Sequence, residues 1–455
     1  MHKIHASQAL TGKGWETDVE ILVSDDGRID AIKSQSGTPD TSLDLALPAP
    51  TNLHSHTFQR AMAGLTETRG PDPKDSFWTW RWLMYRFLER LTPEHIEKIA
   101  ALAFAEMLEA GFGAVAEFHY LHHDTDGTPY GDIAELSARI FVAARQTGIG
   151  LALLPVLYSY GGCDLRPLAG GQLRFGNDAE RYTRLFEAAE KHVADGPGDF
   201  GIGVAPHSLR AVDQSGLEAA VALADNEPVH LHLAEQTAEV DEVLAHRGAR
   251  PTEWLLDNFC VDEHWCLIHA TQMTSDETNR LAKTGAVAGL CPITESSLGD
   301  GIFNGTEYRT AGGRFGVGSD SNIHIALFEE LCTLEYSQRL RDRSRAALAS
   351  QERSTGRILF DAAAQSGAQA AGRDAGRLAP GQWADIIGLT TDNAWLSDRS
   401  GDTTLDSLIF SGRGRDCITD VWSAGRHVVT DGQHVQKESI IRDFKDVVRE
   451  LGQDI

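Results

Sequence analysis

Two histidines separated by a single residue are the first candidates for chemistry in this sequence, in the stretch Asn52-Leu53-His54-Ser55-His56. An apolar run, residues 45–50, precedes them and predicts a β-strand. Successive side chains on a strand point to opposite faces, so His54 and His56 point the same way and can place two imidazoles on one metal ion. Among 18 histidines such a pair also arises by chance, from surface or core residues, so further ligands must be sought elsewhere.

Three later stretches place polar side chains where a predicted strand ends. They are His230-Leu231-His232-Leu233-Ala234-Glu235, His269 and Ser319-Asp320-Ser321-Asn322. Where strands alternate with helices in a barrel, the carboxyl ends of the strands meet at one face, and the catalytic groups lie there. Each of these residues alone is also explained as a core side chain. Together they predict a third imidazole, a carboxylate, a glutamate and a further histidine around one site.

Short apolar runs alternate with helical segments between about residues 48 and 370, which predicts an α/β fold, a closed (β/α)8 barrel of TIM type. The eight expected strands are residues 46–53, 114–118, 150–157, 200–205, 228–233, 266–268, 286–290 and 315–318. Caps and periodicity indicate the helices between them. A helix begins at Thr92-Pro93-Glu94 and ends at Gly111, and residues 178–193 form another.

Strand-like segments at both ends of the chain predict a small β-sandwich domain. The expected strands are residues 15–23 and 28–33, followed after the barrel by residues 384–389, 405–410 and 421–429. Two short all-β pieces bury a face only when they pack together. We therefore expect residues 1–47 and 373–436 to form the small domain, residues 48–372 to form the barrel, and residues 437–455 to form a C-terminal helix.

The composition excludes several classes of partner. Lys and Arg number 41 against 66 Asp and Glu, a net charge of −25 that repels nucleic-acid phosphates and anionic membranes. The six cysteines form no Cys-x-x-Cys pair, and neither a signal segment nor a run of 18 apolar residues occurs. We expect a soluble cytoplasmic protein that binds a small molecule, with no nucleic-acid or membrane partner. We also expect a homodimer, an assembly that no sequence feature singles out.

The joint pattern of metal and acid–base candidates resembles the amidohydrolase superfamily, in its branch of mononuclear aminohydrolases and deaminases, over nearly the whole chain. The resemblance implies that one divalent metal is bound by His54, His56, His232 and Asp320. It also implies three catalytic roles: Glu235 shuttles a proton, His269 faces the metal-bound water or the tetrahedral intermediate, and Asp320 accepts a proton while it binds the metal.

The residues predict one zinc ion per chain. Three imidazoles and a carboxylate suit zinc, which makes a hydroxide available near neutral pH. Relatives with two metals carry a bridging lysine at the end of a middle strand, and residues 150–160 and 201–209 contain no lysine. His230 shares the strand face of His232. The family pattern uses only the second, so we interpret His230 as a neighbour of the ligands and leave the reverse assignment open.

Three stretches resemble a family within this branch, the deiminases of N-formimino-L-glutamate, which release ammonia and N-formyl-L-glutamate in histidine degradation. They are residues 52–64, 117–124 and 205–212. That substrate carries two carboxylates and an amidine, so the pocket needs cations and hydrogen-bond donors beside the metal. The candidate substrate-binding residues are Gln59, Arg81, Tyr120, His207 and Arg210.

Some of these residues also have structural interpretations. Arg81 lies in Trp78-Thr79-Trp80-Arg81-Trp82, where an amphipathic helix would also place an arginine, and Tyr120 is also explained as a core residue. The remaining reactive side chains are interpreted as ordering a loop or packing: His119, His122, His123 and Cys291.

Two other functions are open to a chain of this kind. A different aminohydrolase of the same branch would act on guanine, cytosine or a chloro-triazine, but an aromatic ring calls for stacking and edge hydrogen bonds rather than two arginines. A non-catalytic barrel that serves only in assembly would have lost ligands, whereas all four ligands and both acid–base residues are present here.

Overall fold

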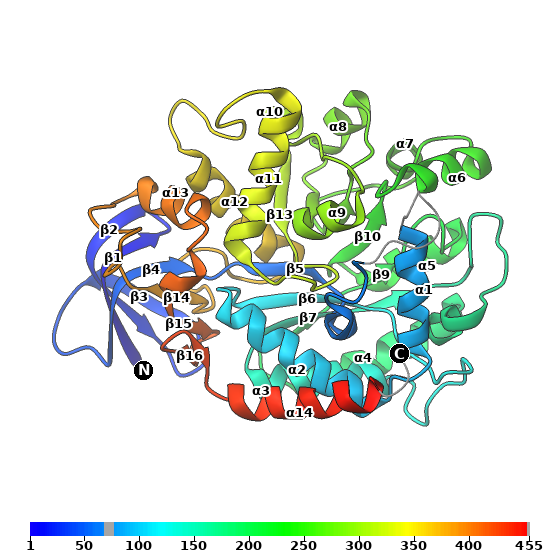
Figure 1. Ribbon diagram of the computed structural model, residues 1–455, viewed down its shortest axis with the longest axis horizontal. Helices are drawn as coiled ribbons and strands as arrows, with labels where there is room; N and C mark the ends of the chain where they lie inside the picture. The colour runs from blue at the N-terminus through cyan, green and yellow to red at the C-terminus, as the bar shows by residue number, and fades with distance from the viewer. Residues whose placement is uncertain (68–76, 453–455) are drawn as a thin grey trace.

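The computed structural model describes residues 1–67 and 77–452, and of residues 77–82 it describes the backbone alone. Its larger unit is a ring of parallel strands with helices around it (Figure 1). The strands are β5 (Thr51–Ser55), β6 (Ala114–His119), β7 (Gly150–Leu157), β8 (Gly201–Ile202) with β9 (Ala205–Pro206), β10 (Val229–Leu233), β11 (Trp265–His269), β12 (Val287–Leu290) and β13 (Arg314–Val317).

The ring is closed by bridges between strands that are distant in the sequence. Both β8 and β9 pair with β7, so they fill one position in the barrel. A bridge between Ser208 and His232 links this position to β10, and a bridge between Ser55 and Asp320 joins β5 to the end of β13. The expected TIM-type barrel is confirmed.

Helices cover the outside of the barrel. They are η1 (Thr57–Met62), α1 (Phe77–Leu88), α2 (Pro93–Glu109), α3 (Glu135–Thr147), η2 (Gly170–Phe175), α4 (Ala179–Ala194), α5 (Gln214–Ala224), α6 (Thr237–Arg247), α7 (Pro251–Asn258), α8 (Ser275–Leu281), α9 (Pro292–Leu298), α10 (Gly305–Thr310), α11 (Leu327–Asp342) and α12 (Thr355–Ala370). The expected caps are present: the Thr92 hydroxyl accepts from His95 N at 3.3 Å, and Asp178 accepts from Arg181 N at 2.8 Å.

The smaller unit is a mixed sheet formed from both ends of the chain (Figure 1). Its strands are β1 (His2–Thr11), β2 (Gly14–Val23), β3 (Ile29–Ser34), β4 (Thr41–Pro48), β14 (Ile386–Leu389), β15 (Ile418–Ser423), β16 (Arg426–Thr430) and β17 (Gln433–His434), in the order β17-β16-β15-β14-β4-β1-β2-β3. The sheet curls over a core that includes Ile21, Ile386 and Trp422, and a bridge joins Arg28 to Trp383 across the curl. The expected small β-domain therefore needs both termini.

Three strand predictions differ from the structure. Residues 46–53 are not one strand, because β4 of the small sheet ends at Pro48 and β5 of the barrel begins at Thr51. Ala49 and Pro50 lie between them, and proline has no N–H to continue a ladder. Residues 405–410 belong to a helix, α13 (Asp402–Phe410), which buries Leu405, Leu408 and Ile409 on one face. Residues 421–429 divide into β15 and β16 at a turn where Ala424 and Gly425 both have positive φ, at 43° and 74°.

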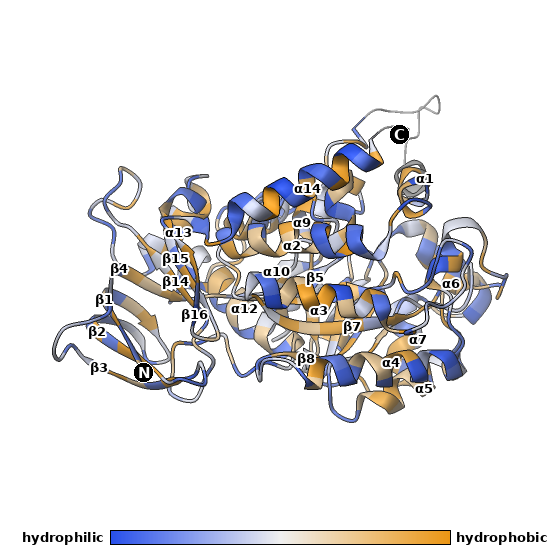
Figure 2. Cartoon of the chain, turned by 90° about the horizontal axis from the view of Figure 1, so that it is seen from below, coloured by the Kyte–Doolittle hydropathy of each residue, from blue (hydrophilic) through white to orange (hydrophobic). Residues whose placement is uncertain are grey.

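The chain closes with α14 (Lys437–Leu451), which lies against α2 on the outside of the barrel (Figure 1). Hydrophobic and hydrophilic residues alternate along it in Figure 2, and Ile440, Val447 and Leu451 are its buried side chains. The expected amphipathic C-terminal helix is confirmed. Among the helices of residues 1–67 and 77–452, none has the length and apolar character needed to cross a bilayer.

A buried ion-pair cluster ties the small sheet to the barrel. Arg373, after α12, pairs with Asp385 through Nε at 2.8 Å and Nη2 at 3.0 Å, and with Asp199 at 3.1 Å. Arg426 of β16 makes two further bonds of 2.7 Å to Asp199. The side chains of Asp199 and Asp385 are only 1% and 2% exposed, so each carboxylate depends on these arginines for compensation.

We predict that Arg373→Met lowers the free energy of unfolding by about 3 to 5 kcal/mol, because it leaves the buried Asp385 without its partner. Urea titration followed by circular dichroism measures the change. Arg184→Met is the control: Arg184 pairs with Glu180 on the exposed face of α4, and its loss should cost less than about 1 kcal/mol. Equal effects of the two changes would contradict the prediction.

Candidate active site

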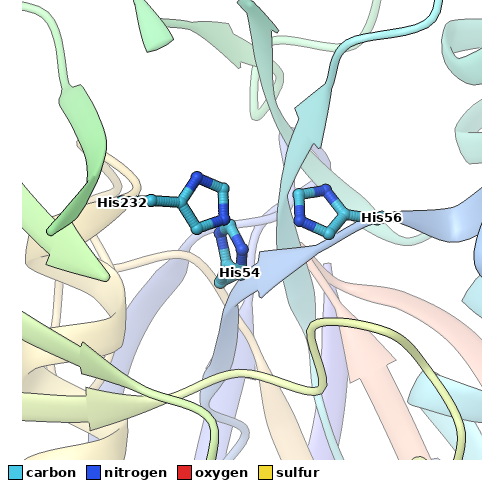
Figure 3. Close-up of side chains that lie close together, drawn as sticks. All are labelled: His54, His56 and His232. Atoms are coloured by element: carbon cyan, nitrogen blue, oxygen red, sulfur yellow. The ribbon is translucent and has the colours of Figure 1, made fainter. Parts of the chain in front are cut away.

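Three imidazoles converge inside the barrel at the carboxyl ends of β5 and β10. Figure 3 shows His54 of β5, His56 directly after β5 and His232 of β10 with their rings turned toward one another. One nitrogen from each ring lies within 4.8 Å of a nitrogen of the other two. The spacing of two residues at the end of β5 places His54 and His56 in this cluster, while the barrel closure brings β10 to it.

The carboxylate of Asp320 completes the cluster. Its Oδ1 lies 3.2 Å from His56 Nε2 and 3.5 Å from His54 Nε2, so it faces the same space as the imidazoles. Asp320 follows β13, which the Ser55–Asp320 bridge joins to β5. The four residues expected to bind one metal are thus brought together.

The ring nitrogens of these histidines are arranged for a cation. His56 Nδ1 lies 2.9 Å from the Phe118 carbonyl and His232 Nδ1 lies 3.1 Å from the His207 carbonyl. A carbonyl only accepts, so each Nδ1 donates and each Nε2 keeps its lone pair. Within the part of the chain that the structure describes, neither ring nitrogen of the buried His54 has a hydrogen-bond partner.

Burial lowers the pKa of His54, His56 and His232, so all three rings are held neutral. Metals bind the neutral imidazole, and an unsatisfied buried nitrogen is costly. Three neutral imidazoles and one carboxylate therefore fit a divalent metal such as zinc.

His230 lies on the same face of β10 but outside this cluster. Its Nε2 donates to the Ala370 carbonyl at 2.7 Å, at the end of α12, and burial lowers the pKa of His230 to about 4. Of the two histidines on this strand, His232 is therefore the one whose free nitrogen faces His54.

Glu235 and His269 lie beside the cluster as a second pair of groups. His269 Nε2 is 3.9 Å from Glu235 Oε1 and 3.9 Å from Asp320 Oδ2. Burial raises the pKa of Glu235. Burial lowers the pKa of His269, but the carboxylates of Glu235, Glu295 and Asp320 outweigh this effect and raise it to about 10. The arrangement provides a carboxyl group suited to carry a proton and an imidazole suited to donate a hydrogen bond.

Glu295, near the start of α9, orients this histidine and was not predicted. Its Oε1 lies 3.2 Å from His269 Nδ1 and also accepts from Cys291 N at 2.8 Å. The signal was available, because Glu295 follows β12 as the other candidates follow their strands. Cys291 caps α9 as a buried residue, and burial raises the pKa of its thiol.

The backbone is strained at the ends of the strands that carry the site. Ala234, His269 and Asp320 have φ of 50°, 69° and 46°, in the left-handed region that non-glycine residues rarely adopt. Such conformations persist only where the surrounding structure holds them, and they gather at functional sites. These strand ends carry Glu235, His269 and Asp320, which all line the same cavity.

A cavity opens from the histidine cluster toward the barrel mouth. Gln59, Tyr120, His207 and Arg210 line it together with Glu235, His269 and Asp320. Gln59 Nε2 donates to the Tyr120 hydroxyl at 2.6 Å. Arg81 lies in α1, and its side chain falls outside the described residues. Six further lining residues were not predicted as site residues, because the segments that carry them meet only in the folded chain: Met84, Tyr85, Tyr158, Phe175, Leu298 and Ser321.

Arg210 is a partly buried cation, and no carboxylate among the described residues lies within ion-pair distance of its guanidinium. Its Nη1 donates to the Tyr158 hydroxyl at 3.3 Å. A guanidinium that is largely withdrawn from water normally pairs with an anion. Arg210 therefore leaves part of the cavity able to receive an anionic group.

His119 is the last residue of β6, and His122 and His123 lie in the loop that follows it. His122 Nε2 bonds to the Val156 carbonyl at 3.0 Å and His123 Nε2 to the Gly176 carbonyl at 2.9 Å. The backbone N–H groups of His122 and His123 both donate to the Arg174 carbonyl. These contacts join the loop to its neighbours, which agrees with an ordering role.

Comparison with known families gives two matches that together span most of the chain. The family described as "Amidohydrolase family" matches residues 45–428. The family described as "Formimidoylglutamate deiminase HutF, N-terminal domain" matches residues 1–39. The first match covers the barrel and part of the small sheet, and the second covers the first three strands of that sheet.

Individual relatives agree with these matches. A formimidoylglutamate deiminase of Pseudomonas aeruginosa is 47% identical, over 99% of this chain and all of that protein. The crystal structure of an amidohydrolase from Brucella melitensis is also 47% identical and superposes with a TM-score of 0.95, over 99% of this chain and 100% of that one. An adenosine deaminase from Xanthomonas campestris, solved with bound zinc, shares the fold at 21% identity with a TM-score of 0.83, over 99% of this chain and 98% of that one.

The two histidines of β10 provide a matched test of the metal cluster. We predict that the purified protein contains about one equivalent of zinc, that His232→Asn loses it, and that His230→Asn keeps it, because only His232 directs a free nitrogen at His54. Elemental analysis after dialysis measures the metal. A reproducible two equivalents that are both needed for turnover, or loss of metal in His230→Asn, would overturn this ligand set.

Proposed function

Because the chain belongs to the amidohydrolase family, we propose that its barrel site hydrolyses N-formimino-L-glutamate to N-formyl-L-glutamate and ammonia, a step of histidine degradation. The similarity to a formimidoylglutamate deiminase over the full length of both proteins supports this substrate. The observation that carries the proposal is the guanidinium of Arg210, which has no carboxylate within ion-pair distance among the described residues and lines a cavity that begins at the histidine cluster. A dicarboxylate with a reactive amidine matches both ends of that cavity.

The carboxylates of the substrate are bound by groups that line the cavity. Arg210 meets one of them, and a guanidinium fork grips a carboxylate in two places. His207, Gln59 and Tyr120 offer further hydrogen-bonding groups along the wall. Arg81 on α1 is the second arginine that we assign to the substrate. A chain with a net charge of −25 needs such local cations to bind a dianion.

We assign one zinc ion per chain to His54, His56, His232 and Asp320. Bound there, the metal supplies Lewis acidity and lowers the pKa of a coordinated water to about 7. The homodimer and the cytoplasmic location stay predictions from the sequence.

Glu235 carries the proton in the proposed reaction. Its carboxylate takes a proton from the water that attacks the amidine carbon and delivers it to the nitrogen that departs as ammonia. The burial that raises the pKa of Glu235 favours this exchange between protonated and ionised forms. Across the overall reaction one C–N bond breaks and one C–O bond forms, so water and the amidine account for all atoms of the formamide and ammonia.

His269 is the hydrogen-bond donor in the proposed reaction. Glu295 holds its Nδ1, which directs Nε2 toward Glu235 and Asp320 and toward the oxygen that the carbon acquires. Asp320 is placed to accept a proton as well as to hold the metal. The two carboxylates and the imidazole thus surround the position where the amidine carbon must lie.

We expect Glu235→Gln to reduce kcat by about a hundredfold or more while zinc content is unchanged, because glutamine keeps the size of the side chain but cannot carry a proton. A coupled assay for ammonia release gives kcat, and elemental analysis gives the metal. Glu187→Gln, on the exposed face of α4, is the matched control and should behave as the unaltered protein. Normal turnover by Glu235→Gln would move the proton shuttle to another residue, with His269 next in line.

The substrate is tested by an ammonia-release assay over N-formimino-L-glutamate, formimino compounds without a carboxylate, guanine and cytosine. We predict that the first is the best substrate and that Arg210→Met lowers its kcat/KM by about a hundredfold or more, since the substrate carboxylate loses its cationic partner. Arg280→Met, which removes an arginine from the exposed end of α8, should have no effect. Efficient turnover of guanine or cytosine, with N-formimino-L-glutamate inert and Arg210→Met unaffected, would leave only the family assignment.

A further inference from the structure

A chain of buried polar side chains joins the first and the last of the metal-binding stretches, and none of its members has a part in the proposed reaction. Its members are Asn52 and Ser55 in β5, and Ser319 and Asn322 in the loop that follows β13. Each is at most 1% exposed, and none lines the cavity. Burying such groups is unfavourable unless they are paired, so their position beside the candidate ligands needs a reason.

The hydrogen bonds among these residues link them in series, and the donor and the acceptor of each bond are fixed. Asn52 Oδ1 accepts from Ser319 N at 3.0 Å, and Asn52 Nδ2 donates to Ser319 Oγ at 2.6 Å. The Ser319 hydroxyl then donates to Asn322 Oδ1 at 2.6 Å. Asn322 Nδ2 donates to Ser55 Oγ at 3.1 Å, back on β5. Since an amide nitrogen only donates and an amide oxygen only accepts, each side chain has one orientation that satisfies its neighbours.

The same chain holds the backbone of the loop that carries Asp320. Asn322 Nδ2 makes a second bond, of 3.1 Å, to the Asp320 carbonyl. That carbonyl also accepts from His56 N at 2.9 Å, and Asp320 N donates to the His54 carbonyl at 2.9 Å. Asp320 and Asn322 have φ of 46° and 54°, in the left-handed region, which Asp and Asn adopt more readily than other non-glycine residues.

These contacts matter for the metal because they set the distance between ligands on different strands. Asp320 Oδ1 is 3.2 Å from His56 Nε2 and 3.5 Å from His54 Nε2, although the two stretches are more than 260 residues apart in the sequence. Metal–ligand distances tolerate changes of only about 0.2 Å. A shift of the loop relative to β5 by a few times this amount would remove Asp320 from the ligand set.

We propose that Asn52, Ser319 and Asn322 form a latch that positions Asp320 against His54 and His56, and that this latch sets how tightly the barrel holds its metal. The inference rests on the metal site proposed above. The three latch residues touch neither the substrate cavity nor the candidate metal position, so they act through Asp320 as positioning residues.

The test is zinc affinity, measured by competition with a chromophoric chelator on the purified full-length protein. We expect Asn322→Ala and Ser319→Ala each to bind zinc about tenfold or more weakly and to lose it faster to excess chelator. Substitution of residues that support metal ligands usually has an effect of this size. The matched control is Asn304→Ala. Asn304 donates to the Met273 carbonyl and to Thr278 Oγ1 in another part of the barrel, so zinc affinity should not change.

A second measurement separates positioning from general stability. The unfolding temperature of each variant is measured with zinc and after zinc removal. If the latch acts on the metal, the rise in unfolding temperature caused by zinc becomes smaller in Asn322→Ala than in the unaltered protein. A purely structural latch would destabilise the zinc-bound and the zinc-free variant equally. It would leave zinc affinity and the zinc-dependent rise in unfolding temperature unchanged, and that result would overturn the proposal.

Two remaining outcomes are also decisive. Should Asn322→Ala fail to fold, Ser319→Ala removes a single hydroxyl and provides the same measurement. Should the unaltered protein bind no zinc, the proposed metal site fails and the latch fails with it. That result differs from a protein that binds zinc and whose latch variants bind it equally well, which would overturn the latch alone.

Discussion

The structure depends on one constraint. Polar groups gathered in the barrel have lost contact with water, and their contacts with one another do not compensate the cost of that burial. No described residue makes a hydrogen bond to either ring nitrogen of His54, and the Nε2 atoms of His56 and His232 are directed at this ring and at Asp320 rather than at donors. Such an arrangement is unfavourable for the protein alone and favourable around a divalent cation. The strained backbone at Ala234, His269 and Asp320 is a second unfavourable feature that the fold sustains in the same place.

The surrounding structure holds these polar groups in place despite the cost of burying them. Carbonyls of neighbouring strands fix the ring orientation of two imidazoles, Glu295 fixes His269, and a hydrogen-bonded chain from Asn52 to Asn322 joins β5 to the loop after β13. Farther out, the cluster of Arg373 and Arg426 with Asp199 and Asp385 ties the barrel to the small sheet. Side chains outside the cavity thus determine how accurately those inside it are placed.

The net charge of the whole chain and the local charge at Arg210 in the cavity have opposite signs. The chain carries a net charge of −25, yet the cavity contains Arg210, which has a tyrosine hydroxyl as its partner and no carboxylate within ion-pair distance among the described residues. Close to the metal cluster the acidic groups Glu235 and Asp320 lie beside His269. An elongated substrate with an anionic end and an amidine end can therefore be oriented by electrostatics alone, with its anionic end at Arg210.

The sequence by itself determined the features that depend on residues close together along the chain. The alternation along a strand predicted that His54 and His56 share a face, caps at Thr92 and Asp178 predicted helix starts, and polar residues after strands predicted His232, Glu235, His269 and Asp320. Local pattern could not assign Pro48 to the end of one sheet and Thr51 to the start of another, nor distinguish the helix at Leu405 from a strand, because a short apolar run suits either. Only the tertiary structure decided that Glu295 reaches His269, that Tyr158 meets Arg210, and that Asn52 pairs with Ser319. Those contacts depend on the register between strands far apart in the chain, which results from the packing of the whole barrel rather than from any one segment.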